Sequence, residues 1–263
     1  MKRSLPPVVM IPGAFCGPWA FDKFRPVFEK AGYRVHTPSL RHHEAGAPSK
    51  TLGTTSLLDY AKDLEAFIAT LPATPILLGH SMGGLLAQML AAKGLARALV
   101  LLAPSAPWGV LPSTWMELAS AQTMFLAGDF WNSPLKPVSW IADANSLDHL
   151  PPDERREVFA HFVPESGLAT FETMHWALDA RRAAEVPARK VTCPILCMVG
   201  SDDKINPPGT VRGVAQRYSG RVVFEELPGF SHWLLGEPGW EKIAARAIEW
   251  LAAAMAEETK AAT

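Results

Sequence analysis

The most constraining feature of this chain is the segment Ile76–Gly84, which reads I-L-L-G-H-S-M-G-G. An apolar run typical of a buried strand stops at a serine, and the helix-forming stretch Leu85–Lys93 follows it. So sharp a turn forces Ser81 into a strained backbone conformation, and Gly79 and Gly83 must lack side chains to let the chain pass. The pattern therefore predicts a nucleophile elbow, a strand-to-helix turn with the Ser81 hydroxyl exposed above a sheet.

The same turn predicts a place where negative charge is stabilised. The backbone N–H of Met82 would lie at the positive end of the predicted helix, where it can bind an oxyanion. An oxyanion needs a second donor, and the loop after the first predicted strand, I-P-G-A-F-C-G-P-W, offers the N–H of Ala14. Gly13 would let that loop approach the serine. An ordinary strand-to-helix turn would also explain Gly13 and Gly17.

A serine hydroxyl reacts at neutral pH only when a base accepts its proton and a carboxylate orients that base. In the elbow class these groups follow one another in the order serine, acid, histidine. Asp202 and Asp203 come directly after the predicted strand Ile195–Gly200, and His232 lies in a loop after the predicted strand Arg221–Leu227. The chain thus supplies an acid and a base in the expected order. The preceding residue of the elbow, His80, is expected to face away from the nucleophile.

Short β-type runs alternate with helical patterns before residue 104 and again after residue 188, which is typical of a parallel sheet covered by helices. The predicted strands are Val8–Ile11, Arg34–Thr37, Ile76–Gly79, Ala98–Ala103, Ile195–Gly200 and Arg221–Leu227. The predicted helices are Trp19–Ala31, Leu57–Thr70, Met82–Lys93, Pro208–Tyr218 and Trp240–Ala256. We therefore expect an α/β core of residues 1–104 and 188–263.

Residues 105–187 interrupt this alternation with helical pieces broken by prolines and without β-type runs. They contain five of the nine tryptophans, namely Trp108, Trp115, Trp131, Trp140 and Trp176. An insertion at this point lies above the carboxyl ends of the strands, where open α/β sheets bind ligands, so we expect a helical cap over an apolar pocket. We place Phe15, Trp108 and Trp233 in that pocket. The alternative for Trp108 is that it packs the cap onto the core.

Taken together, these motifs resemble the α/β-hydrolase superfamily from about Val8 to Ala256. The segments G-H-S-M-G-G, G-S-D-D-K-I-N-P and G-F-S-H-W-L-L-G-E-P are similar to its nucleophile, acid and base segments, and the acid pattern selects Asp203 over Asp202. The loop G-A-F-C-G-P-W-A-F resembles that of small esterases and hydroxynitrile lyases. Pro12 stands where a histidine is usual, and P-S-L-R-H-H stands where the family commonly carries an aspartate and a glycine. The two leading strands of the full family sheet are missing, which leaves six strands, mainly parallel.

The resemblance implies a cofactor-free, carboxylesterase-like serine hydrolase with Ser81, Asp203 and His232 as its triad. Its substrate would be a small to medium apolar ester, thioester or lactone, cleaved through an acyl-enzyme. A serine nucleophile excludes dehalogenase and epoxide-hydrolase chemistry, which needs a carboxylate. Three alternatives stay open: a cofactor-free haloperoxidase, a lyase for which Lys204 alone could supply a lysine near the site, and a non-catalytic ligand receptor.

Charge and hydropathy exclude some partners. The chain has 25 basic and 26 acidic residues, a net charge of −1, which gives no electrostatic footprint for nucleic acid. No segment approaches the roughly 20 apolar residues that span a bilayer, and the apolar run Val8–Ile11 is too short for a signal peptide. We expect a cytoplasmic protein.

Three cysteines, Cys16, Cys193 and Cys197, leave an odd count. The last two flank C-P-I-L-C in a predicted strand, where about 13 Å separates them, too far for a disulfide. Free thiols in a reducing compartment are therefore expected, without a metal site or cofactor. The cluster His42-His43-Glu44 is interpreted as a solvated loop.

Overall fold

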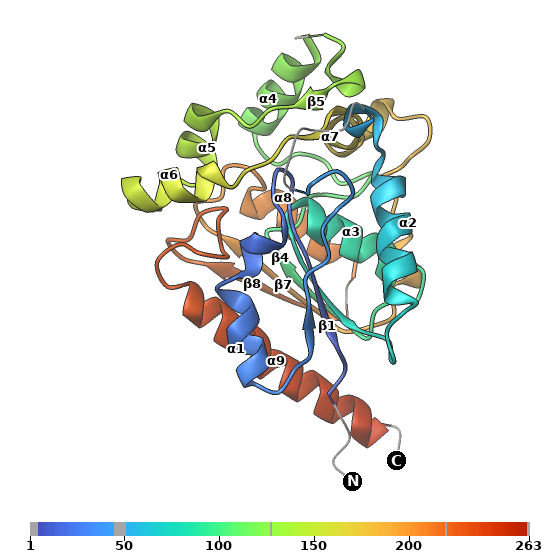
Figure 1. The fold of residues 1–263 in the computed structure, drawn as a ribbon. Helices are drawn as coiled ribbons and strands as arrows, with labels where there is room; N and C mark the ends of the chain where they lie inside the picture. Colours follow the sequence, from blue (N-terminus) through green and yellow to red (C-terminus); the bar gives the residue numbers. More distant parts are fainter. Residues whose placement is uncertain (1–4, 45–50, 127, 219, 262–263) are drawn as a thin grey trace.

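The computed structural model describes residues 5–44, 51–126, 128–218 and 220–261 (Figure 1). Six strands form a parallel sheet in the order β2-β1-β3-β4-β7-β8. They are β1 (Val8–Ile11), β2 (Val35–His36), β3 (Ile76–His80), β4 (Ala98–Leu102), β7 (Ile195–Gly200) and β8 (Val222–Leu227). The predicted sheet of about six mainly parallel strands is confirmed.

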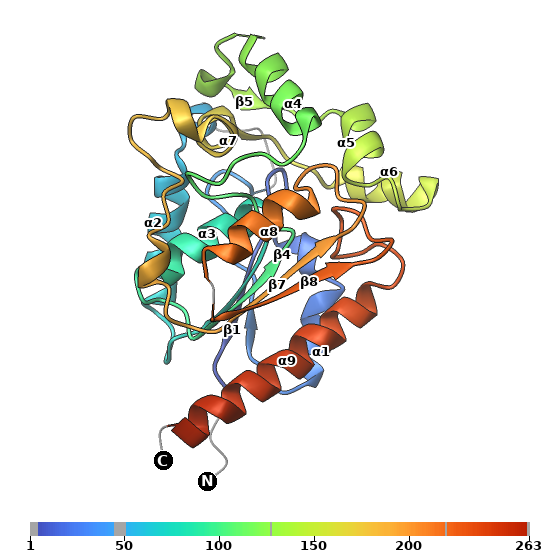
Figure 2. The same ribbon diagram turned by 180° about the vertical axis from the view of Figure 1, so that it is seen from behind.

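Helices cover both faces of the sheet (Figures 1 and 2). One face packs against α2 (Leu57–Ile68), α3 (Met82–Ala91) and α8 (Pro208–Gln216). The other packs against α1 (Phe24–Lys30) and α9 (Trp240–Ala261). The strands β1, β3, β4 and β7 therefore contribute to both apolar cores, since successive side chains point to opposite faces. The central strands β1, β3, β4 and β7 are accordingly buried along their whole length.

One predicted helix is divided in the structure. Instead of a single helix over Trp19–Ala31, a 3₁₀ turn at Pro18–Phe21 precedes α1, which begins at Phe24. Pro26 explains the division, because it has no N–H to bond a carbonyl four residues earlier and is tolerated only in a first turn. The helix therefore has to restart just before it.

The inserted segment, residues 105–187, lies beyond the carboxyl ends of the strands (Figure 1). It contains α4 (Trp115–Leu126), β5 (Pro134–Leu135), α5 (Ser139–Asn145), α6 (Pro152–Ala160), β6 (Glu165–Ser166) and α7 (Gly167–Met174). The expectation of no strands here was wrong for β5 and β6, which pair antiparallel. Two residues per strand are too few to produce an alternating pattern. Further 3₁₀ turns span Leu52–Thr54, Phe130–Asn132, Trp176–Leu178 and Ala188–Lys190.

Candidate active site

The turn between β3 and α3 holds Ser81 in a conformation that few non-glycine residues adopt. Its φ is 53° and its ψ is −121°. A Cβ on Gly83 would overlap the carbonyl oxygen of Ile11, and a Cβ on Gly79 would overlap the carbonyl oxygen of Gly83. The spacing of these glycines thus has the steric cause that the sequence indicated. The sequence predicted an exposed Ser81 hydroxyl. In the structure Ser81 is instead buried, since only 7% of the residue is exposed.

The loop after β1 packs directly on Ser81. A Cβ on Gly13 would lie 3.0 Å from the Cβ of Ser81, so no larger residue fits there without a shift. The next residue is Ala14, which is half-buried. The N–H of Phe15 already donates to Glu165 at 3.2 Å and is not free for another acceptor. This leaves the Ala14 N–H as the loop donor to consider, beside that of Met82, which starts α3 and has no intrahelical acceptor.

The predicted acid and base meet in the structure. Nδ1 of His232 lies 2.8 Å from Oδ2 of Asp203, and both residues are buried. The other carboxylate oxygen accepts the backbone N–H groups of Ile205 and Asn206, each at 2.8 Å. Because a carboxylate only accepts, Nδ1 of His232 carries the hydrogen. Its Nε2 is then left with a lone pair that can accept a proton.

The neighbouring aspartate has different contacts. Oδ1 of Asp202 accepts a hydrogen bond from Ser201 Oγ at 2.7 Å, and 49% of its side chain is exposed. Asp203, by contrast, is 4% exposed. The structure therefore pairs His232 with Asp203 and leaves Asp202 at the surface of a turn.

Two buried side chains to which the sequence assigned no role, His80 and Glu237, hold the backbone around His232. Nε2 of His80 donates to the carbonyl oxygen of His232 at 2.9 Å, and burial and the nearby His232 ring lower the pKa of His80 to about 3. The carboxylate of Glu237 accepts the N–H and the hydroxyl of Ser231 at 3.0 Å. Burial raises the pKa of Glu237, although the bonds from Ser231 oppose the shift. His80 and Glu237 thus fix the loop from both sides.

The three residues assigned to a substrate pocket have different surroundings. Phe15 lies in the loop over Ser81, with a φ of 65°. Trp108 is half-buried, and its ring contacts Trp176 at 5.4 Å and the Arg182 guanidinium at 4.4 Å. Trp233 is 4% exposed and belongs to the apolar core on the α1 and α9 face. The ring contacts of Trp108 are with other residues of the inserted segment, and those of Trp233 indicate a core residue.

Lys204 is tied to the inserted segment. Its Nζ donates to Asp148 Oδ2 at 2.6 Å and to the carbonyl of Ala144 at 3.1 Å. The cation is therefore already paired, which weighs against the lyase alternative.

Across the part of the chain that the structure describes, His, Cys, Asp and Glu side chains form no group of three or more that could hold a metal ion.

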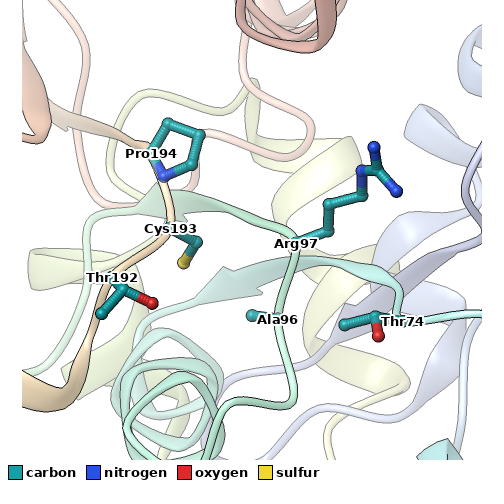
Figure 3. A pocket seen from close by; sticks show the side chains of 6 residues that line it. All are labelled: Thr74, Ala96, Arg97, Thr192, Cys193 and Pro194. Carbon is teal, nitrogen blue, oxygen red and sulfur yellow. The ribbon is translucent and has the colours of Figure 1, made fainter. Parts of the chain in front are cut away.

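The cysteines are free and buried. Burial raises the pKa of Cys197 to about 12 and that of Cys193 to about 11. Cys193 lines a hollow of about 390 Å³ with Thr74, Ala96, Arg97, Thr192 and Pro194 (Figure 3). These residues precede β3, β4 and β7, so the hollow lies at the opposite edge of the sheet from Ser81. Neither the thiols nor this hollow belongs to the site.

The interpretation of residues 42–44 as a solvated loop was wrong for His43. This residue is 4% exposed, and its Nε2 lies 3.0 Å from the buried carboxylate of Glu165. The partner is 122 residues away in the chain, so no local pattern indicates it.

Among the helices of the described ranges, none has the length and apolar character needed to cross a membrane.

Residues 8–246 match the model of the alpha/beta hydrolase family. The chain belongs to this family. A pyrethroid hydrolase of Sphingobium wenxiniae is 26% identical to this α/β hydrolase over 228 residues, which are 84% of the chain and 79% of that protein. The structure resembles that of a monoacylglycerol lipase from Paleococcus ferrophilus, with a TM-score of 0.67, 24% identity and coverage of 94% and 96% of the two chains. It also resembles a methylesterase from Arabidopsis, with a TM-score of 0.70, 15% identity and coverage of 94% and 99%.

Proposed function

We propose that this α/β hydrolase is a cofactor-free serine hydrolase that cleaves carboxylic esters through an acyl-enzyme on Ser81. The observation that carries the proposal is the hydrogen bond between Asp203 and Nδ1 of His232, whose ring centroid lies 4.9 Å from that of His80, the residue before the strained Ser81. That bond orients His232 as a base rather than as a donor. The relative that is named a pyrethroid hydrolase supports a hydrolytic reaction.

The reaction follows from these groups. Nε2 of His232 accepts the proton of the Ser81 hydroxyl while Oγ attacks the ester carbonyl carbon. The carbonyl oxygen becomes negative and is stabilised by the N–H groups of Ala14 and Met82. When the tetrahedral intermediate collapses, the C–O bond to the alcohol breaks, and the alcohol leaves with the proton from His232. A water molecule, deprotonated by His232, then attacks the acyl carbon. The bond between that carbon and Ser81 Oγ breaks, His232 returns the proton to Oγ, and the acid and free Ser81 are released.

The inserted segment acts in this proposal as a helical cap that favours an apolar acyl group. Its aromatic side chains pack on one another, as in the contacts of Phe130 with Trp131 at 5.3 Å and with Phe171 at 6.3 Å. Burial of apolar area contributes about 25 cal/mol per Å², and one or two additional methylenes discriminate by about 1–3 kcal/mol. We therefore expect kcat/KM to rise from acetyl to medium or aromatic acyl esters.

The test compares p-nitrophenyl esters of increasing acyl length with acyl-CoA thioesters and lactones. Esters of medium acyl length should be cleaved fastest, and Ser81→Ala should lower kcat by roughly 10⁴-fold or more while the protein stays folded. Hydrolysis of p-nitrophenyl acetate by Ser81→Ala at near the parent rate would remove Ser81 from the reaction. If the parent protein prefers acetyl or succinyl esters, the apolar pocket is wrong, whereas the assignment of Ser81 as the nucleophile is unaffected.

A further inference from the structure

The loop that carries the Ala14 N–H contains a strained residue. Phe15 has a φ of 65°, in the left-handed region that side chains other than Asn and Asp rarely adopt. Such a conformation persists only where the surroundings over-determine it. Ala14 is the adjacent residue, so whatever holds Phe15 also restrains the loop that carries the Ala14 N–H.

The inserted segment holds both backbone groups of Phe15. The carbonyl oxygen of Phe15 accepts the N–H of Val163 at 2.9 Å, and its N–H donates to the Glu165 carboxylate at 3.2 Å. We call these two hydrogen bonds the clamp. They join residues about 150 positions apart in the chain. Because they engage the peptide groups on either side of the Phe15 Cα, they restrain both of its torsion angles.

Glu165 is itself fixed by four donors. Its Oε2 accepts from Phe15 N–H and from His43 Nε2 at 3.0 Å, while its Oε1 accepts from Tyr60 Oη at 2.7 Å and from Ser166 N–H at 2.6 Å. The side chain is 0% exposed, so water does not compete for these positions. A buried carboxylate with four directed donors has a single orientation.

The charge of Glu165 is balanced in place. Nδ1 of His43 faces the carbonyl oxygen of Arg41 at 3.1 Å, and Nε2 faces Glu165. Both partners only accept, so both ring nitrogens carry hydrogen and the ring is a cation. Burial lowers the pKa of His43, but the carboxylate, its hydrogen bond and the Arg41 carbonyl together raise that pKa above its ordinary value. Glu165 and His43 thus form a buried ion pair beside the loop.

We propose that Glu165 is a positioning residue that, through Phe15, aims the Ala14 N–H at the oxyanion of the tetrahedral intermediate. This inference rests on the proposed function. It gives the inserted segment a part in the chemical step, beyond covering the site. Because the contribution of an oxyanion donor depends on its placement, loss of the clamp should lower kcat and leave ground-state binding largely unchanged.

Glu172 offers a matched control. It is also a buried carboxylate of the inserted segment, with 1% of the residue exposed. It also accepts hydrogen bonds from the core, at 2.7 Å from Ser56 Oγ and 2.7 Å from Leu57 N–H. These donors belong to the start of α2 rather than to the loop over Ser81. Substitution of Glu172 should therefore weaken the attachment of the segment without moving the Ala14 N–H.

The experiment compares Glu165→Ala and Glu165→Gln with Glu172→Ala and Glu172→Gln. For each variant, kcat and KM are measured with p-nitrophenyl butyrate, and Tm is measured by calorimetry. The inhibition constant is measured with phenylboronic acid, which forms a tetrahedral adduct with a reactive serine. Glu165→Ala should lower kcat on the order of 10²-fold and weaken boronate inhibition, with KM within about threefold of the parent. Glu172→Ala should lower Tm comparably and keep kcat within about threefold.

Equal kcat values for the Glu165 and Glu172 variants of the same type would overturn the clamp and leave the proposed function intact. If Glu165→Ala does not fold, Glu165→Gln decides instead. Its volume is similar, but its one amide oxygen cannot accept from all four donors, so kcat should fall below that of Glu172→Gln. A parent protein that cleaves no ester overturns the proposed function and the clamp together.

Discussion

The nucleophile elbow and the inserted segment are held in place by different interactions. At the elbow, backbone packs on backbone, with Gly83 against the carbonyl of Ile11 and Gly79 against the carbonyl of Gly83. The inserted segment is joined to the core by buried carboxylates, Glu165 and Glu172, that accept hydrogen bonds from core residues. The elbow therefore tolerates no added atom, whereas the attachment of the segment depends in part on buried charge.

This difference separates two ways of disturbing the site. A steric contact between main-chain atoms is insensitive to pH and salt, so the turn at Ser81 should change only with the sequence. A buried ion pair is lost when one partner changes its protonation state. A change of pH should therefore affect the site through the inserted segment.

The largest effect is expected at the elbow. Gly83→Ala should lower the free energy of unfolding by about 3 kcal/mol or more, since its Cβ would overlap main-chain oxygens that cannot move independently. Gly213→Ala is the control, because its Cβ would meet only a side-chain methyl of Val110 at 3.3 Å and α8 gains helix propensity. Urea unfolding measures both. A Gly83→Ala variant as stable as Gly213→Ala would mean that the turn is not sterically fixed.

The next effect separates the two aspartates. Asp203→Asn should lower kcat by about 10³–10⁴-fold, because an amide in place of the carboxylate favours the wrong tautomer of His232. Asp202→Asn should change kcat by less than about threefold, since its carboxylate bonds Ser201 at the surface. Steady-state kinetics with p-nitrophenyl butyrate decides, and the reverse ranking would assign the acid to Asp202.

A smaller effect is expected from pH at the attachment of the segment. The pKa of His43 is raised in the folded protein, so its pairing with Glu165 contributes stability that is fully present below about pH 6.5 and is lost as the pH rises through the folded-state pKa. Replacing the ring by His43→Gln should therefore flatten the decrease of Tm above that pH. The groups that act on this pair are Arg41, Glu44, Tyr60 and Cys16.

The adjacent histidine provides the control for this measurement. His42 has a φ of 67°, which asparagine tolerates, and its Nε2 lies 3.2 Å from Thr51 Oγ1. His42→Asn should keep the parent dependence of Tm on pH. If His43→Gln and the parent show the same dependence between pH 6 and 9, the pair is not charged in the folded state.

The smallest effect concerns Trp108. Its ring packs on Trp176 and Arg182, so Trp108→Ala should reduce stability and leave the ratio of kcat/KM values for octanoyl and acetyl esters within about threefold of the parent. A selective loss of activity on long acyl esters would return Trp108 to the substrate pocket. The acyl-length profile of the two proteins is the measurement.

The local features of this molecule could be predicted from sequence, because their causes are local. The glycines at 79 and 83 indicate the turn at Ser81, and the apolar runs indicate strands that are buried on both faces. The pairing of Asp203 with His232 follows from their place after two adjacent parallel strands, whose carboxyl ends meet at one edge of the sheet. In each case a few neighbouring residues carry the whole signal.

The remaining features depend on contacts that no short segment contains. His43 stands in a polar stretch, and only Glu165, 122 residues later, makes it a buried cation. His80 holds a carbonyl 152 residues away, and Trp233 lies in a core most of whose members come from distant strands and helices. Buried polar groups are decided by partners brought together by the fold, so sequence periodicity did not reveal them.

A fluorophosphonate probe, which reacts covalently with activated serines, shows whether Ser81 is a reactive nucleophile. Intact mass should show one adduct on the parent protein, and peptide mapping should place it on Ser81. Ser81→Ala should remain unlabelled, whereas Ser105→Ala, which lacks a serine equally buried at 7% exposure, should be labelled like the parent. A folded parent protein that stays unmodified, or one whose adduct lies on another residue, would contradict the account.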